Sequence, residues 1–118
     1  MLVGVDSIES ERMNKHLKDD TLRTFFTEYE INYSNVKNKV LRLAGIFCAK
    51  EAFLKALGIG IGGGIKLSEI EVNHLDNGKP YLKLSDNAIK YINDLGYTKY
   101  EINISHTDQF SFAVCVIS

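Results

Sequence analysis

Residues 43–57 read LAGIFCAKEAFLKAL. Only Lys50, Glu51 and Lys55 are charged in this stretch. A helix that is apolar on nearly all of its sides is normally buried, because each side must be removed from water. The stretch therefore predicts a long helix at the centre of the fold, with the remaining elements packed around it.

The ends of this helix have their own signals. It is predicted to begin near Val36, because Asn35 offers a side-chain oxygen as an N-cap. It is predicted to end at Leu57, because Gly58 accepts the left-handed conformation that commonly follows a helix. The Gly-rich loop that comes next, GIGIGGGIK, lacks the GK[ST] of a P-loop and follows a helix instead of preceding one. Taken alone, it indicates a flexible turn more strongly than a phosphate site.

Strand-like segments lie on both sides of the central helix. The N-terminal MLVGVD is apolar and rich in β-branched residues, which predicts a buried strand. Two later pairs of strand-like runs are joined by the short turns DNGKP and Thr107–Gln109, and such short turns force antiparallel pairing. The fold class is therefore α+β, an antiparallel sheet packed with a long buried helix. The predicted strands are residues 1–6, 67–75, 80–84, 99–106 and 110–118, and the predicted helices are residues 7–19, one or two within 20–34, 36–57 and 86–95.

Length and composition restrict the class of protein. The chain has 118 residues, a net charge of -1 and 45% hydrophobic residues, which predicts one globular domain over residues 1–118. Without an excess of basic residues, binding to nucleic acid is not expected. No apolar run reaches the about 18 residues of a membrane span, and no signal-peptide pattern is present, so we expect a cytoplasmic protein. Cys48 and Cys115 lie in apolar runs and are expected to be buried, reduced thiols.

Two carboxylates stand in apolar surroundings. Three of the four residues one helical turn from Glu51 are apolar or nearly so, and burying an ionised carboxylate there is unfavourable unless a cation compensates it. An ion pair with Lys55 and a bound metal ion are both candidates for this compensation. Asp6 ends the first predicted strand on the face of Gly4, where it would be either the N-cap of the next helix or part of a site.

His106 also ends a predicted strand, on the face shared with Ile102 and Ile104. A structural histidine and a site residue are both open interpretations. Sites are commonly built at strand ends and in the loops beyond them. His106 and Asp6 both end predicted strands, so the two residues are candidates for one site.

Several segments resemble one known family. GVDSIESER resembles the G-[IV]-D-x-x-x-x-E-R opening of the holo-acyl-carrier-protein synthases, the small phosphopantetheinyl transferases. FCAKEAFLKALGIGI resembles the A-K-E-A-[FL]-x-K-A-x-G-x-G signature of that family. DNGKPYL and ISHTDQFSFAVCVI resemble its N-G-K-P turn and its C-terminal strand pair. The matches lie in the same order as in the family and span nearly the whole chain, and the AKEAFLKALG run with the upstream GVD is the specific part.

The resemblance implies a Mg²⁺-dependent transferase with the family's phosphopantetheinyl transferase fold. It would move 4'-phosphopantetheine from coenzyme A to a serine of apo acyl carrier protein, in fatty acid biosynthesis, and release adenosine 3',5'-bisphosphate. By this resemblance Asp6 and Glu51 would ligate Mg²⁺, and together with Lys55 they would form the catalytic set. The serine proton would pass either to Glu51 or to a metal-bound hydroxide.

The resemblance also implies how the substrates and subunits are arranged. The protein would be a homotrimer with active sites between subunits, and His106 and the turn at 77–80 would come from the neighbouring chain. The carrier protein would dock on the first helix through Arg12, Lys15 and Lys18, whose charges suit an acidic partner. The residues expected to contact coenzyme A are Lys50, Lys55, Gly58, Gly60, Lys79, Pro80, His106 and Thr107.

Ile46 departs from the family pattern, in which arginine is usual. This departure favours a rival interpretation, a family member that binds coenzyme A or the carrier without transferring. The retained Asp6, Glu51 and Lys55 oppose it. Arg42 lies four residues before Ile46 and shares its helix face, so it is either a substitute phosphate contact or a surface arginine.

Overall fold

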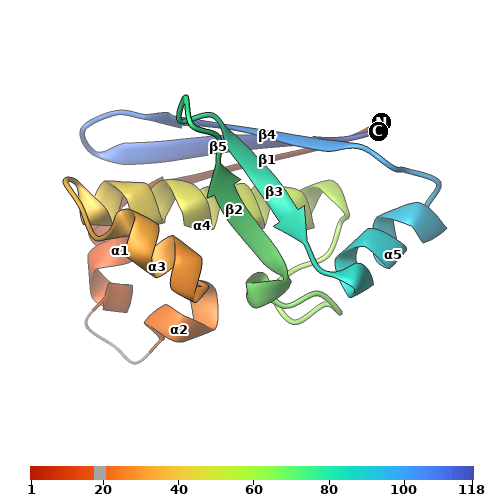
Figure 1. Cartoon of the computed structure of the whole chain (residues 1–118), viewed down its shortest axis with the longest axis horizontal. Helices are drawn as coiled ribbons and strands as arrows, with labels where there is room; N and C mark the ends of the chain where they lie inside the picture. Colours follow the sequence, from red (N-terminus) through yellow and green to blue (C-terminus); the bar gives the residue numbers. More distant parts are fainter. Residues whose placement is uncertain (18–20) are drawn as a thin grey trace.

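The computed structural model describes residues 1–17 and 21–118 and shows an α+β fold with two antiparallel sheets (Figure 1). This confirms the predicted fold class. The strands are β1 (Leu2–Glu9), β2 (Ile70–His74), β3 (Pro80–Leu84), β4 (Tyr100–His106) and β5 (Phe110–Ile117). The helices are α1 (Ser10–Leu17), α2 (Leu22–Phe25), α3 (Glu28–Ser34), α4 (Lys39–Ala56) and α5 (Asp86–Asp94), with a 3-10 turn η1 (Leu67–Glu69).

The larger sheet has the strand order β1-β5-β4, and α4 packs along one of its faces (Figure 1). Side chains alternate between its faces, so Gly4 and Ile8 of β1 are buried while Val3 and Val5 are 53% and 59% exposed. The hairpin of β2 and β3 forms the second sheet and contacts α4 and β4. Among the helices of the described ranges, none has the length and apolar character to cross a bilayer.

Helix α4 is the buried centre of the fold, as residues 43–57 predict. Most of its side chains from Leu43 onward are buried, and α1, α3 and β2 pack on sides that the large sheet leaves open. The predicted stop is confirmed, because Gly58 has a φ of 72° and Ile59 N–H donates to Leu54 O at 3.0 Å. The helix begins later than predicted, at Lys39.

The predicted cap of α4 is wrong. Asn35 lies at the end of α3 instead, and Asn38 precedes α4 with a left-handed φ of 60°. Asparagine tolerates this conformation better than most residues, so the chain can turn sharply between the two helices.

Strand β1 is also longer than predicted. Ser7 and Glu9 continue the antiparallel register opposite Phe112 and Phe110 of β5, so the strand runs on through the positions expected to begin a helix. The expectation that Asp6 caps the next helix is therefore wrong. Asp6 lies inside a paired strand, opposite Ala113, and its side chain belongs to the face that packs on α4.

The remaining elements were predicted with smaller errors. The strand predicted at 67–75 begins only at Ile70, because η1 occupies the preceding residues. Ser85 caps α5, the helix predicted at 86–95, since its hydroxyl accepts the N–H of Ala88. Both cysteines are buried free thiols, and burial raises the pKa of Cys115 to about 12.

Candidate active site

Glycine at position 4 lets β1 lie directly on α4. A Cβ at Gly4 would lie 1.9 Å from the carbonyl oxygen of Ala52 and 2.5 Å from the nitrogen of Ala56, so any larger residue would push the strand away. Asp6 follows two residues later on the same face of β1. This close approach places its carboxylate beside Lys55 of α4.

The structure brings Asp6, Glu51 and Lys55 together, and we call these three residues the carboxylate cluster. The Lys55 ammonium donates to Asp6 Oδ1 at 2.7 Å. The predicted alternative, an ion pair between Lys55 and Glu51, is not formed; the ion pairs found across residues 1–17 and 21–118 do not include Glu51. Glu51 is half-buried and lies near enough to Asp6 for the two charges to interact.

The electrostatics of the carboxylate cluster favour a cation. Burial raises the pKa of Glu51 and the charge of Asp6 raises it further, whereas Lys55 lowers it. The hydrogen bond to Asp6 raises the pKa of Lys55, so the ammonium stays charged. One ammonium, bonded to Asp6, is therefore the positive charge that acts on both carboxylates.

Cys48 lies one turn before this part of α4, and its thiol donates to the carbonyl of Ser111 at 3.5 Å. Burial, and then the charge of Asp6, raise the pKa of this thiol, so it stays protonated. Within the described part of the chain, no group of three or more His, Cys, Asp or Glu side chains is placed to hold a metal ion. Among the described residues, Asp6 and Glu51 are the carboxylates that the cluster offers to a cation.

Gly58 and Gly60 lie in the loop that leaves α4 directly after its last turn, which carries Lys55. Both glycines are exposed, and the Gly60 carbonyl accepts the N–H of Gly63 at 3.0 Å. The loop therefore presents backbone groups next to the carboxylate cluster. A contact between these glycines and coenzyme A stays a prediction.

Lys50 does not belong to this site. Its ammonium is fully buried, forms an ion pair with Glu30 at 2.5 Å, and donates to the carbonyls of Phe25 at 2.8 Å and Leu67 at 3.0 Å. All three N–H donors are used, so the expectation that Lys50 contacts coenzyme A is wrong. Successive helix residues point about 100° apart, which turns Lys50 away from its neighbour Glu51.

The Lys50–Glu30 pair joins α4 to α3 and β2. The second oxygen of Glu30 accepts the N–H of Val72 in β2 at 2.8 Å. Burial raises the pKa of Glu30 and lowers that of Lys50, and each charge opposes the shift of the other. The pair is a structural feature of the interior.

His106 lines a pocket of about 350 Å³, which we call the histidine pocket. Pro80 lines it from the start of β3, and Arg42 and Gly45 line it from α4. A Cβ at Gly45 would lie 2.5 Å from His106 Cε1, so the imidazole packs directly on the helix. Because β4 and β1 are the outer strands of the large sheet, His106 and Asp6 come from opposite edges of that sheet.

Thr107 and Lys79 are next to the histidine pocket in the chain but do not line it. The Thr107 hydroxyl accepts the N–H of Phe110 at 3.0 Å within the β4–β5 turn. Lys79 has an exposed side chain, and its N–H donates to the Asn77 side chain at 3.0 Å. Their predicted contacts with coenzyme A stay predictions.

Three side chains stack in the histidine pocket that sequence reasoning did not group. The rings of Tyr33 and His74 are parallel within 6°, with centroids 3.7 Å apart, and the Arg42 guanidinium lies 5.1 Å from the Tyr33 centroid. Burial, and then the charge of Arg42, lower the pKa of both His74 and His106. These residues come from α3, α4, β2 and β4, so no local pattern could have revealed the group.

Arg12 and Lys15 are exposed on α1, whose Met13 is fully buried. The helix therefore packs on one side and offers basic side chains on the other. Lys18, the third residue predicted to dock the carrier, lies outside the described residues. Docking on α1 stays a prediction.

The chain belongs to the 4'-phosphopantetheinyl transferase superfamily, whose family model matches residues 2–115. The holo-[acyl-carrier-protein] synthase of Caldicellulosiruptor saccharolyticus is 38% identical over 117 residues, covering 97% of this chain and 93% of the relative. The synthase of Halothermothrix orenii is 36% identical over 118 residues, covering 97% and 94%.

Solved structures of such synthases share the fold. The Helicobacter pylori enzyme in complex with coenzyme A has a TM-score of 0.86 at 29% identity, covering 99% of this chain and 100% of that one. The Bacillus anthracis enzyme, solved in complex with CoA (3',5'-ADP), has a TM-score of 0.81 at 33% identity, covering 98% and 94%.

Proposed function

We propose that this protein transfers 4'-phosphopantetheine from coenzyme A to a serine of apo acyl carrier protein. The observation that carries the proposal is the carboxylate cluster, on a fold shared with coenzyme-bound synthases. Asp6, Glu51 and Lys55 together offer groups for a divalent cation and for phosphate oxygens. The relatives that match over nearly their whole length are named holo-[acyl-carrier-protein] synthase, which supports the same reaction.

Mg²⁺ fits the donor set of the carboxylate cluster. It is usually held by one or two protein carboxylates and takes its other ligands from water and substrate phosphates. Asp6 and Glu51 would hold it. Burial, and then the charge of Asp6, raise the pKa of Glu51, and a cation beside the ionised carboxylates would oppose both effects. When bound, Mg²⁺ would neutralise charge on the pyrophosphate of coenzyme A.

In the proposed reaction, the serine oxygen bonds to the phosphorus that carries pantetheine, the P–O bond to adenosine 3',5'-bisphosphate breaks, and the serine proton is released to solvent. Such transfer depends mainly on positioning and on neutralisation of charge. Lys55 suits this role, because its side chain is 53% exposed and its ammonium can turn from Asp6 to a phosphate oxygen.

We also propose a trimer in which the two halves of each site come from neighbouring subunits. The face of the large sheet that points away from α4 exposes apolar side chains, including Val3, Val5, Phe110 and Phe112. Such a patch favours association between copies of the chain. The histidine pocket and the carboxylate cluster lie along opposite edges of this sheet, so association can bring the pocket of one subunit to the cluster of the next.

The test is incubation with coenzyme A, Mg²⁺ and an apo carrier protein, followed by intact mass measurement of the carrier. We expect the carrier to gain one phosphopantetheine, and no gain when coenzyme A is omitted or Mg²⁺ is chelated. An unmodified carrier that a known transferase still modifies would favour the rival interpretation, binding without transfer.

The proposed docking of the carrier protein on α1 gives a second prediction. Reversing the charges of Arg12 and Lys15 to glutamate should raise the KM for the carrier about tenfold, equivalent to about 1.4 kcal/mol, because an acidic partner would be repelled. The KM for coenzyme A should stay unchanged, and the effect should shrink with added salt. Lys83→Glu, an exposed charge reversal on β3, is the control. Equal rises for both substrates would mean that the fold of α1 has been disturbed.

Arg42 gives a third prediction. Ile46, where the family usually has arginine, is a core residue with 1% exposure. Both Ile46 and Arg42 line the histidine pocket, and Arg42 brings a guanidinium group to it. Arg42 donates only its Nε to Lys37 O, at 3.1 Å, and no ion pair of the described ranges includes it. Its terminal nitrogens are therefore available to an anion, and the planar guanidinium suits phosphate.

Arg42→Ala should raise the KM for coenzyme A at least fivefold, since a charged hydrogen bond contributes about 1–3 kcal/mol. The analogue without the 3'-phosphate should be affected much less if that phosphate is the contact. The variant and the native protein would have the same KM for coenzyme A, and the same KM for the analogue, if Arg42 were a surface arginine without this role.

A further inference from the structure

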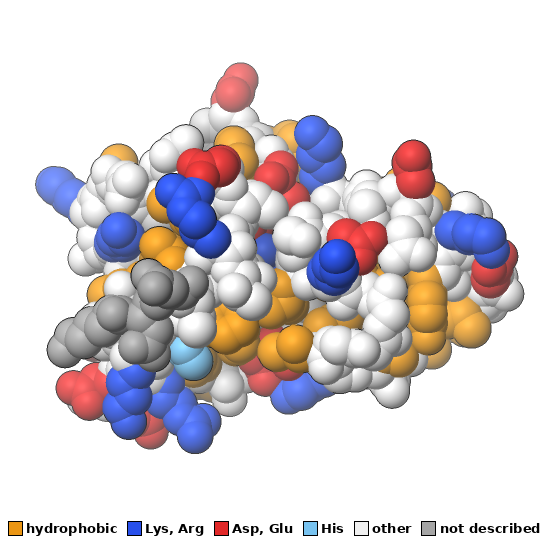
Figure 2. Space-filling view, turned by 90° about the horizontal axis from the view of Figure 1, so that it is seen from below, with side chains coloured by type: hydrophobic (Ala, Val, Ile, Leu, Met, Phe, Trp, Pro, Cys, Tyr) orange, Lys and Arg blue, Asp and Glu red, His pale blue; other side chains and the backbone are white. Residues whose placement is uncertain are grey.

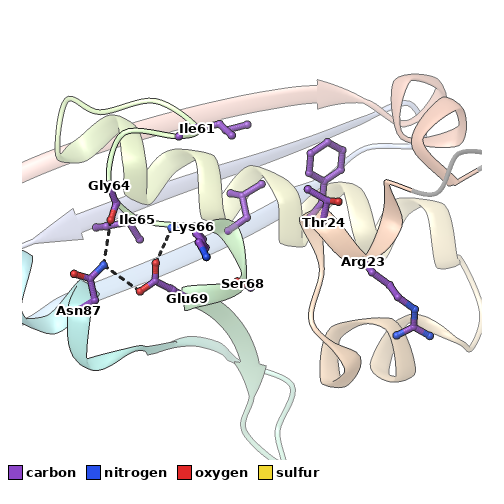
Figure 3. A pocket seen from close by; sticks show the side chains of 12 residues that line it. Arg23, Thr24, Ile61, Gly64, Ile65, Lys66, Ser68, Glu69 and Asn87 are labelled. Atoms are coloured by element: carbon purple, nitrogen blue, oxygen red, sulfur yellow. Dashed lines mark hydrogen bonds between the residues drawn. The ribbon is translucent and has the colours of Figure 1, made fainter.

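Most polar side chains of this protein are reached by water. Lysine, arginine, aspartate and glutamate side chains project from the face seen in Figure 2. In the cavity of about 920 Å³ between α2, the Gly-rich loop after α4 and the first turn of α5, the Asn87 amide donates to the Gly64 carbonyl at 3.1 Å, and both residues are exposed (Figure 3). Water can replace a hydrogen bond at such a position, so the loss of that bond costs little.

The buried polar side chains are a smaller group, and each of them needs a partner inside the protein. Among the described residues they are Glu30, Ser34, Lys50 and Ser111. Glu30 and Lys50 pair with each other, and the Ser34 hydroxyl has no hydrogen-bond partner within the described part of the chain. The Ser111 hydroxyl lies 2.8 Å from His106 Nδ1, so this buried serine contacts a residue of the histidine pocket.

Ser111 lies on β5, the middle strand of the large sheet, directly opposite His106 of β4. Opposite residues of an antiparallel pair point to the same side of the sheet, and here it is the side that packs on α4. The Leu41 carbonyl of α4 lies 3.5 Å from the Ser111 hydroxyl, and the Cys48 thiol donates to the Ser111 carbonyl at 3.5 Å. Strand and helix therefore hold the hydroxyl against the imidazole.

The single proton of the Ser111 hydroxyl has two acceptors within reach, His106 Nδ1 at 2.8 Å and the Leu41 carbonyl at 3.5 Å. Hydroxyl hydrogen bonds are normally about 2.5–3.0 Å long, so the Leu41 carbonyl is a poor acceptor at its distance. If Nδ1 carried the imidazole proton, the buried hydroxyl would be left with that poor acceptor, which is unfavourable. The hydroxyl is satisfied when Nδ1 is unprotonated, and the proton of a neutral imidazole is then on Nε2.

The Nε2 atom of His106 faces the histidine pocket. It lies 3.1 Å from the position of a Cβ at Gly45, and both residues line that pocket. The bond to Ser111 is the side-chain hydrogen bond that His106 forms within the described residues, so Nε2 is available to a ligand beside the Arg42 guanidinium. Burial, and then the charge of Arg42, lower the pKa of His106, so the imidazole is neutral near neutral pH.

We propose that Ser111 is a positioning residue that keeps the proton of His106 on Nε2, so that the histidine pocket presents an N–H donor to a phosphate of coenzyme A. The proposal rests on the proposed transferase function. Ionised phosphate oxygens only accept hydrogen bonds. An unprotonated Nε2 would face them with a lone pair, whereas Nε2–H adds a donor to those of Arg42. Ser111 itself is fully buried and acts through the imidazole.

The tautomer of His106 can be measured by nitrogen NMR of the imidazole rings at about pH 8, where a histidine with a lowered pKa is neutral. In the native protein we expect a protonated Nε2 and an unprotonated Nδ1, assigned by the loss of these signals in His106→Ala. In Ser111→Ala the signals should move towards a mixture of the two tautomers. The matched control is Ser34→Ala, which removes another fully buried hydroxyl and should leave the His106 signals unchanged.

Calorimetric binding of coenzyme A, with Mg²⁺ and without the carrier, measures the consequence for the ligand. Ser111→Ala should weaken binding about three- to tenfold, the loss expected for one ordinary hydrogen bond, and Ser34→Ala should bind like the native protein. In a His106→Ala background, Ser111→Ala should change the affinity by less than about twofold, because no imidazole is left to position. Melting temperatures show that each variant is folded.

Three results would each overturn the role of Ser111. They are a proton on Nδ1 in the native protein, native affinity for coenzyme A in Ser111→Ala, and an equal loss of affinity from Ser111→Ala with and without His106. The last result would mean that the serine supports the fold and not the imidazole. If the native protein does not bind coenzyme A, the proposed transferase function fails instead, and the NMR spectra still decide whether Ser111 sets the tautomer.

Discussion

Replacing Glu51 with glutamine, or Asp6 with asparagine, is expected to reduce turnover by at least about 100-fold while the chain stays folded. Each change keeps the volume of the side chain and removes a negative charge from the carboxylate cluster. Groups that stabilise charge in a transition state contribute about 10²–10³-fold each when tested by substitution. Turnover should be measured at saturating Mg²⁺, with circular dichroism as the test of folding.

The thermal stability of Glu51→Gln separates a role in the site from a role in the fold. Burial and the charge of Asp6 raise the pKa of Glu51, so ionised Glu51 destabilises the folded state near neutral pH. Removing that charge should leave the melting temperature unchanged or raise it. Asp94→Asn, on the exposed side of α5, is the control and should retain full activity. Near-native turnover in either Glu51→Gln or Asp6→Asn would contradict the metal assignment.

Mixing two inactive variants, Glu51→Gln and His106→Ala, is expected to restore activity. A site built from the cluster of one subunit and the histidine pocket of the next needs Glu51 from one chain and His106 from the other. Random mixing in trimers should make about one site in four intact, so activity should approach a quarter of the native value. Light scattering should report a trimer for each variant and for the mixture.

The mixing experiment requires proof that subunits exchange, for example by mass measurement of mixed trimers that carry a tag on one variant. Each variant alone should stay inactive under the same treatment. If verified exchange restores nothing, Glu51 and His106 act within one subunit, and the exposed apolar face of the large sheet has another partner.

Much of the secondary structure could be predicted because its signals are local. The apolar run around Glu51, the left-handed Gly58 and the cap at Ser85 each depend on residues within one or two turns. The errors arose where a distant partner extended or replaced the local pattern. β1 passes through Asp6 because β5 continues to pair with it, and no signal near residue 6 reports that pairing.

Lys50 is the clearest case of a site residue misassigned from sequence. The family resemblance implied a contact between Lys50 and coenzyme A, but the Lys50 ammonium forms an ion pair inside the protein with Glu30, twenty residues earlier. Spacing along a helix gives the direction of a side chain and not the partner that it meets. The stack of Tyr33, Arg42 and His74 was missed for the same reason.

The sequence by itself determined the α+β class, the buried helix and the identity of the two carboxylates, because hydrophobic periodicity and uncommon buried charges are visible in neighbouring residues. The tertiary structure alone decided that Lys55 pairs with Asp6, that Lys50 turns inward, and that His106 shares a pocket with Arg42. Close packing sets these contacts, since Gly4 and Gly45 let strands approach α4 at positions far apart in the chain. Distances between remote residues depend on that packing, and no local pattern encodes them.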